Sequence, residues 1–305
     1  MAAGDQLGHW ATAKAEREFA SLDEALRDEA VTALREQGWS APDETEVDTT
    51  YGSTHVSHFR GTGVPLVLLH GAGTSSLMWF PLVSNLVGRS IYAIDVVGEP
   101  GRSVQRRPIR DAGDLGSWLD EVLDALSLDA ANLVGASYGG WIALNYARRT
   151  PRRVAALVLV EPVLGKVRPF FWVHGILVAL AFVLPRPLSR RSLRRLHMST
   201  DLLEDTRVRR YGFLGLTRYR RGLPKGVTPV TDAELASANV PTLLLLGEHS
   251  EVHKSRAVAA RVGAVMPKAE AELVNGAGHA LPVDIPDEVA SRLRSFLAKA
   301  RPASE

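Results

Sequence analysis

A serine flanked by glycines is the clearest chemical signature in this sequence of 305 residues. The letters GASYG at positions 135–139 follow an apolar run that predicts a strand and precede a helical pattern, which places Ser137 at a strand-to-helix turn. Small neighbours let strand and helix approach closely around a serine in a strained conformation. A chance match in a glycine-rich turn is the alternative, but the flanking elements favour a nucleophile.

A histidine that could activate this serine lies near the end of the chain. His279 closes the letters NGAGH, after the last predicted strand and before the C-terminal helix. An imidazole with an ordinary pKa of about 6.5 can take a serine proton and return it to a leaving group at neutral pH. We therefore expect His279 to be the general base, the alternative being a loop histidine with ordinary surface bonds.

Three glutamates compete for the role of the acid that orients this histidine. Glu251 is the first candidate, because it lies in the loop after the strand VPTLLLLGE and gives the chain order serine, acid, histidine. Glu161 is the second, because it ends the preceding predicted strand and points toward the same edge of the sheet. Glu248 is the third, and a structural role suits it better.

Two backbone amides are candidates for stabilising an oxyanion. The letters HGAG at positions 70–73 follow a hydrophobic strand, where the Ala72 N–H could face the nucleophile, and the Tyr138 N–H opens the helix after Ser137. The glycines could instead serve only a tight turn. We expect His70 to be structural and Asp95 to hold a turn.

The sequence predicts no metal and no cofactor. His249, Glu251 and His253 alternate along the chain, but a metal there would consume the acid that serine chemistry needs, and no further ligand set accompanies them. No glycine-rich phosphate loop opens a helix after a strand. The chain has no cysteine, which excludes disulfides and thiolate catalysis, and we expect a cytoplasmic protein.

The elements that must position these residues alternate between short apolar strands and helical segments. Such alternation is typical of an α/β protein with a mostly parallel sheet and helices on both faces. The expected strands are Thr54–Arg60, Val64–His70, Ser90–Asp95, Ala131–Ala136, Val154–Glu161, Val240–Gly247 and Ala271–Asn275.

Two segments of the chain depart from the alternation of strands and helices. Residues 1–45 predict an N-terminal helical extension, with its helix over about residues 10–37. Residues 46–161 and 236–305 form the core, and residues 162–235 a helical cap, because the gap between strands there exceeds what one helix requires.

The cap is rich in arginine. Arg186 to Arg221 contains 11 arginines and three acids, which indicates either a solvated helical face or a surface that meets anions, membrane headgroups or an acidic carrier protein. The apolar run Phe170 to Leu184 has 15 residues, fewer than the roughly 20 that span a bilayer, so no transmembrane segment is predicted. A net charge of +2 does not indicate a nucleic-acid binder.

The segments HGAG, DVVGEPGRS, GASYGG, LLLLGEHSEV and NGAGH together resemble the α/β-hydrolase superfamily over roughly residues 50 to 300. YGSTHV at Tyr51 to Val56, the region of Trp79 and the GEHSEV segment are similar to bacterial carboxylesterases that hydrolyse arylpropionate esters. The resemblance implies an α/β-hydrolase fold and a glutamate acid in the GEH segment, carried onto Glu251. The N-terminal helix and the arginine-rich cap depart from the pattern.

We therefore expect a serine hydrolase that cleaves small carboxylic esters through an acyl-enzyme. The apolar cap residues Phe170, Phe171, Trp172 and Phe182 favour a hydrophobic acyl or aryl group if they face the pocket, whereas otherwise they fill the core of the cap. An acyltransferase or thioesterase-type tailoring enzyme, a membrane-surface lipase and a non-catalytic ligand-binding protein are the alternatives, since one fold hosts many functions. The sequence does not predict an oligomeric state.

Overall fold

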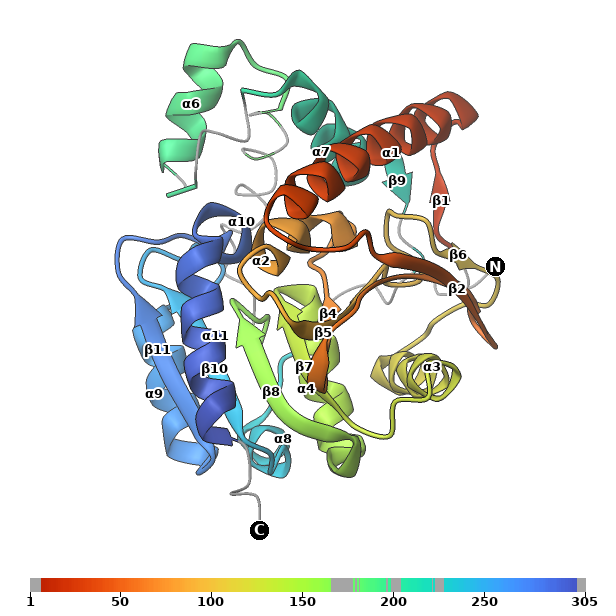
Figure 1. Ribbon diagram of the computed structural model, residues 1–305. Coiled ribbons are helices and arrows are strands. Elements are labelled where there is room, and N and C mark those ends of the chain that lie inside the picture. Colours follow the sequence, from red (N-terminus) through yellow and green to blue (C-terminus); the bar gives the residue numbers. More distant parts are fainter. Residues whose placement is uncertain are drawn as a thin grey trace.

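A large, mostly parallel sheet forms the centre of the computed structural model, which describes residues 7–165, 178, 180, 182–195, 197–198, 204–220, 222 and 228–300 (Figure 1). The strand order is β11-β10-β8-β7-β4-β5-β3-β2, with β6 paired to β3. These strands are β2 (Asp43–Thr49), β3 (Gly52–Phe59), β4 (Thr62–Leu69), β5 (Arg89–Ile94), β6 (Val104–Gln105), β7 (Ala131–Ala136), β8 (Val154–Val160), β10 (Thr242–Gly247) and β11 (Ala269–Val274).

The six strands from β11 to β5 run parallel, whereas β2 and β3 form an antiparallel hairpin at one edge. β7 pairs with both β4 and β8, so it lies inside the sheet and its carboxyl end has neighbours on both sides. This register brings the residues that follow β4, β7, β8 and β10 to one edge of the sheet.

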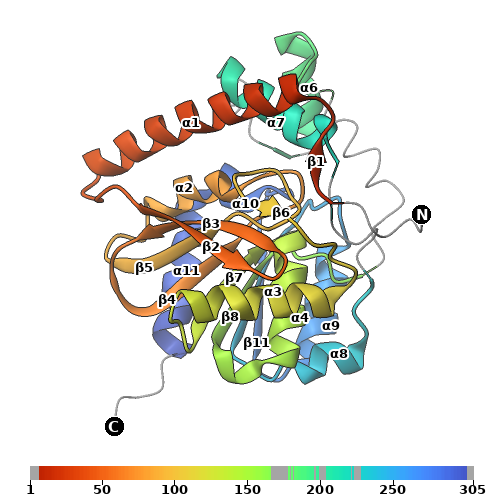
Figure 2. The same ribbon diagram turned by 90° about the vertical axis from the view of Figure 1, so that its right-hand side faces the viewer.

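Helices cover both faces of the sheet (Figure 2). α3 (Ala112–Ala125), α4 (Tyr138–Arg149), α8 (Asp232–Ser237) and α9 (Ser255–Val265) pack on one face. The short η1 (Ser76–Trp79) and α2 (Phe80–Val83), α10 (Leu281–Asp284) and α11 (Pro286–Ala300) pack on the other. Another 3-10 turn, η2 (Pro151–Arg153), leads into β8.

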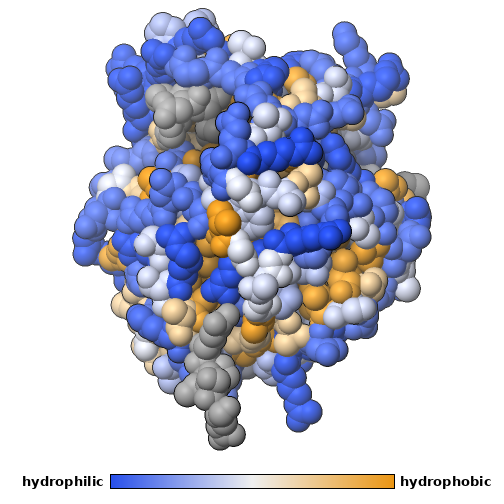
Figure 3. All heavy atoms as spheres, in the orientation of Figure 1, coloured by the Kyte–Doolittle hydropathy of each residue, from blue (hydrophilic) through white to orange (hydrophobic). Residues whose placement is uncertain are grey.

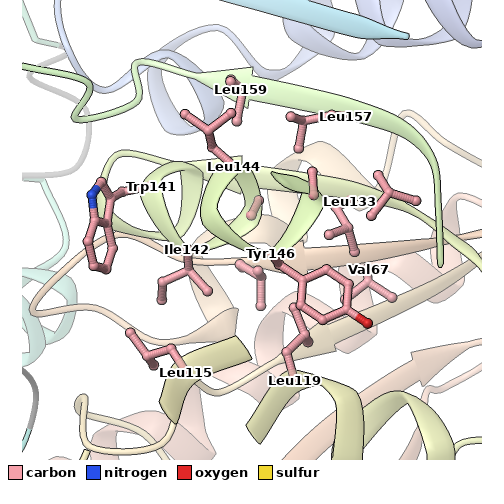
Figure 4. Packing of buried hydrophobic residues seen from close by; sticks show 14 of the residues in the cluster. Val67, Leu115, Leu119, Leu133, Trp141, Ile142, Leu144, Tyr146, Leu157 and Leu159 are labelled. Atoms are coloured by element: carbon pink, nitrogen blue, oxygen red, sulfur yellow. The ribbon is translucent and has the colours of Figure 1, made fainter. Parts of the chain in front are cut away.

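The strands read as continuous apolar runs because both of their faces are buried. In β4, Val67 and Leu69 face one core and Leu66 and Leu68 the other, all with no exposed surface. Figure 4 shows the first core, in which Leu119 of α3 and side chains of α4 lie against the sheet. This packing fixes the start of α4, and therefore the position of the serine before it.

The N-terminal helix α1 (Ala13–Glu36) lies on the side of the molecule toward which the parallel strands point, together with α6 (Arg186–Arg195) and α7 (Thr206–Arg218) (Figures 1 and 2). The rings of Phe19 in α1 and Tyr211 in α7 stack with centroids 4.3 Å apart. β1 (His9–Trp10) pairs with β9 (Tyr219–Arg220) beside them. The N-terminal extension and the described part of the cap therefore share one small core, although the sequence treats them as two segments.

All seven expected strands are present, with ends that differ by a few residues. The sequence missed β2, which is an edge strand in which Val47 alone is buried, so its letters DETEVDT read as a polar stretch. β2 also begins within the segment assigned to the extension, and the division into extension, core and cap remains a proposal. Among the described residues, no helix is both long and apolar enough to cross a membrane.

Candidate active site

Ser137 occupies a strained turn between β7 and α4. Its backbone has φ 50° and ψ −110°, a left-handed conformation that costs free energy in a residue with a side chain. A Cβ at Gly135 would lie 2.3 Å from the Gly139 carbonyl oxygen, and one at Gly139 would lie 2.0 Å from the Leu69 carbonyl oxygen. Both glycines are therefore required by close backbone approach, as the sequence pattern predicted, and the turn leaves Ser137 partly exposed.

His279 lies between the serine and a carboxylate. Its Nε2 is 3.1 Å from Ser137 Oγ, and its Nδ1 is 2.8 Å from Glu161 Oε2. A carboxylate accepts only, so Nδ1 carries the hydrogen and donates it, which leaves Nε2 as the acceptor for the serine hydroxyl. The geometry is that of a nucleophile, a base and an orienting acid.

Glu161 is held in place from several directions. It follows β8 directly, has φ 50° and exposes 1% of its side chain. Oε1 accepts the Gly247 N–H, and Oε2 accepts the Ser250 hydroxyl. Burial by itself would raise the pKa of Glu161, but the hydrogen bonds and charges around it, led by those of His279, lower the pKa below its usual value. Glu161 is therefore an ionised carboxylate aimed at His279.

This geometry corrects the sequence-based order of the candidate acids. The position against His279 Nδ1 is filled by Glu161, the second candidate, and not by Glu251, the first. Glu248, the third, accepts hydrogen bonds from Arg256 and the Gly276 N–H at the surface. The sequence favoured Glu251 because it lies in the loop after β10. In the sheet, however, β8 lies between β7 and β10, so a side chain that follows β8 is closer to the histidine.

A second histidine approaches the same carboxylate. His253 Nε2 is 3.5 Å from Glu161 Oε2, and 10% of the His253 side chain is exposed. Its burial lowers the pKa of His253, which keeps the ring neutral at neutral pH. Sequence reasoning missed the roles of His253 and Ser250 because both come from the loop after β10, and only folding brings that loop over the end of β8.

The loop after β4 lies against the nucleophile. A Cβ at Gly71, the residue before Ala72, would lie 3.5 Å from Ser137 Cβ. The loop is held by two hydrogen bonds: Thr74 Oγ1 donates to the Gly71 carbonyl oxygen, and the Gly73 N–H donates to Glu99 Oε2. Glu99 is 2% exposed, and no sequence signal marked it. A rigid loop at this site suits an oxyanion donor.

His70 and Asp95 have the structural roles that the sequence indicated. The Val96 N–H donates to His70 Nε2, and His70 Nδ1 lies 2.9 Å from the Gly71 carbonyl oxygen, so both ring nitrogens are occupied. Asp95 accepts the Ser76 and Arg102 N–H groups and forms an ion pair with buried Arg27. These contacts tie the loop after β4 to the loop after β5.

The cap approaches this edge of the sheet from above. A hollow of about 460 Å³ lies between the cap residues Arg194, His197 and Met198 and the loop 275–278 that leads to His279. The rings of His197 in the cap and His249 in the loop after β10 stack with centroids 4.1 Å apart. Among the aromatic cap residues considered for the pocket, Phe182 packs with Leu193 in the core of the cap, and the other three lie outside the described residues. The described residues contain no cluster of three or more His, Asp or Glu side chains arranged to hold a metal ion.

Comparisons with known proteins show the family of this chain. Residues 66–292 match the model of the "Alpha/beta hydrolase family". The chain is 30% identical over 262 residues to "Carboxylesterase YbfK" of Bacillus subtilis (strain 168), covering 82% of this chain and 86% of that protein. It is 31% identical over 258 residues to "Uncharacterized carboxylesterase nap" of the same organism, covering 82% and 85%.

The solved structure of naproxen esterase (carboxylesterase NP) from Bacillus subtilis superimposes with a TM-score of 0.75 at 28% identity, covering 89% of this chain and 96% of that one. The resemblance to bacterial carboxylesterases drawn from the sequence motifs is thereby confirmed, as is the expected fold. By its matched sequence, its sheet and its strained serine turn, the chain belongs to the alpha/beta hydrolase family.

Proposed function

We propose that Ser137, His279 and Glu161 are the triad with which this alpha/beta hydrolase cleaves carboxylic esters. The observation that carries the proposal is the continuous chain of hydrogen bonds, 3.1 Å from Ser137 Oγ to His279 Nε2 and 2.8 Å from Nδ1 to Glu161 Oε2. The reaction class is supported by relatives named carboxylesterase, whose alignments cover more than four fifths of this chain and of each relative.

The reaction runs in two halves. Ser137 Oγ attacks the ester carbonyl carbon while its proton passes to His279 Nε2, and the same proton then leaves with the alcohol as the C–O bond breaks. His279 next takes a proton from water, the hydroxide attacks the acyl-enzyme, and the carboxylic acid departs as Oγ regains its proton. Glu161 holds the imidazole in the required tautomer and stabilises the imidazolium. The scheme uses no metal and no cofactor.

The oxyanion of each tetrahedral intermediate is assigned to the N–H groups of Ala72 and Tyr138. Ala72 belongs to the loop that lies against Ser137, and Tyr138 is the first residue of α4, where the positive end of the helix dipole favours a negative charge. Backbone donors on a rigid loop and at a helix start need no reorganisation during the reaction.

The substrate class is a small ester with a hydrophobic acyl or aryl group. The support comes from the relative named for naproxen, which is an arylpropionic acid. The cytoplasmic location expected from the sequence remains a prediction.

The test is release of p-nitrophenol from p-nitrophenyl esters by the wild type and by Ser137→Ala, with mass spectrometry after treatment with a fluorophosphonate. We expect a burst and a single phosphonylated peptide containing Ser137 in the wild type, and a loss of turnover of about 10⁴-fold or more in the variant. If the wild type is labelled but transfers the acyl group to an added alcohol or amine rather than to water, the reaction is acyl transfer and not hydrolysis. A folded wild type with no label and no burst would overturn the proposal.

A further inference from the structure

Helix α6 carries an unusual concentration of positive charge. Its ten residues, RPLSRRSLRR, include five arginines and no acid. Ser189 and Leu193 are its buried residues, and Leu193 packs against Phe182 and Met198 in the core of the cap. At 3.6 residues per turn, the opposite side of the helix presents Leu188, Arg191, Arg194 and Arg195. We call these four residues the α6 face, and all four are exposed.

The arginines of the cap differ in their partners. Two of those in α7 pair with acids of α1, Arg207 with Glu29 and Arg210 with Glu18, so these ion pairs link the cap to the N-terminal helix. At the flank of α6, Arg190 pairs with Glu204. Arg191, Arg194 and Arg195 have no acidic partner within the described part of the chain. The α6 face therefore presents three neighbouring arginines whose charge no acid of the described residues offsets.

Apolar side chains accompany this charge. Leu188 exposes 52% of its surface in the α6 face, and Val183, in the turn before α6, also exposes 52%. Exposed aliphatic side chains among arginines suit the interface of a bilayer, where the guanidinium groups meet phosphates and the apolar groups enter the headgroup region. The sequence just before α6, Phe170 to Leu184, is the longest apolar run in the chain.

The α6 face also has a suitable position. α6 lies at the outer end of the cap, on the side of the molecule to which the carboxyl ends of the strands, and hence Ser137, are directed (Figures 1 and 2). Figure 3 shows mainly hydrophilic side chains on the surface around this corner of the molecule, at the upper left. A planar anionic surface could meet the α6 face without contact with the rest of the core.

We propose that the α6 face docks the protein peripherally on membranes that contain anionic phospholipids. The attraction combines the field of the three arginines, which reaches about one Debye length into solution, with shallow burial of Leu188. An acidic protein would satisfy the same charges, but it gives no reason for exposed leucine and valine beside them. Docking goes beyond ester hydrolysis and does not depend on it.

The experiment is co-sedimentation of the full chain with vesicles of phosphatidylcholine alone or mixed with phosphatidylglycerol, at low and high salt. We expect binding to the mixed vesicles only, weakening as salt rises. The combined variant Arg191→Gln, Arg194→Gln, Arg195→Gln should bind the mixed vesicles with an affinity lower by about tenfold or more. A control that removes three arginines elsewhere, Arg60→Gln, Arg106→Gln, Arg152→Gln, should bind like the wild type.

Circular dichroism and urea denaturation check that both triple variants are folded. Ser137→Ala should sediment like the wild type, so failure of the esterase proposal would leave this one intact. Equal binding to both kinds of vesicle, or undiminished binding of the α6 variant, would overturn docking through this face. Binding to an acidic protein without binding to anionic vesicles would also overturn it and identify a protein partner.

Discussion

Ser137 and Glu161 stand at the carboxyl ends of neighbouring parallel strands, and each has a φ of 50°. The Ser137 N–H donates to the carbonyl oxygen of Val160, the residue just before Glu161, at 3.0 Å. The two strained residues are thus tied by the sheet itself, and His279 bridges their side chains from a separate loop. Strain at both positions, fixed by pairing of β7 with β8, is the kind of pre-organisation that active sites use.

Glutamine substitution separates the two candidate acids. Glu161→Gln should lower kcat for a p-nitrophenyl ester by about 10³- to 10⁴-fold, because an amide removes the negative charge and cannot accept from every donor that faces it. Glu251→Gln is the matched control, with the same chemical change in the neighbouring loop, and should retain kcat within about threefold. The reverse ranking, in folded proteins, would return the role of the acid to Glu251.

Alanine substitution of two glycines tests the close approach that shapes the nucleophile turn. Gly139→Ala should reduce the free energy of unfolding by about 3 kcal/mol or more, because its Cβ would lie 2.0 Å from the Leu69 carbonyl oxygen. Gly263→Ala, at an exposed position of α9 with no atom within 4 Å of the new Cβ, should instead raise the free energy of unfolding by up to about 1 kcal/mol. Urea denaturation measures both, and equal effects would contradict the packing described for the turn.

The ion pair of Asp95 with Arg27 predicts a pH-dependent contribution to stability. Burial by itself would raise the pKa of Asp95, but the charge of the buried Arg27 guanidinium, with the other groups around the carboxyl, lowers this pKa from 3.8 to about 2. A carboxyl whose pKa is lower in the folded than in the unfolded state adds to the free energy of unfolding. This contribution is fully present above the pKa of the unfolded state and disappears as pH falls through the pKa of the folded state. Asp95 should therefore make its full contribution to the free energy of unfolding above about pH 4 and lose it toward about pH 2.

The measurement is urea unfolding of the wild type and Asp95→Asn across this range. At neutral pH the variant should lose about 3 kcal/mol, since Arg27 keeps its burial but loses one carboxylate partner. The difference between the two proteins should shrink as pH falls below about 4, because the Asp95 carboxyl of the unfolded wild type then binds a proton while that of the folded protein does not. A difference that stays constant down to about pH 2.5 would exclude the ion pair as its source.

The sequence by itself determined the fold class and the glycine-flanked turn of Ser137, and the role of His279 as the base remains a proposal. These depend on local rules: apolar runs specify buried parallel strands, and glycines specify the close approach around Ser137. Residues 66–292 match the family model. The sequence did not predict β2 because an edge strand with one buried residue has no alternation of apolar and polar residues.

Only the tertiary structure decided which glutamate meets His279 and which arginines pair with acids of α1. Glu161 and Glu251 each follow a predicted strand, and strand order, which places β8 between β7 and β10, brings Glu161 to the imidazole. The arginines of α6 and α7 are alike in sequence, but α1 pairs with Arg207 and Arg210 of α7. Contacts between segments more than 100 residues apart make both choices, and such contacts leave no trace in local composition or spacing.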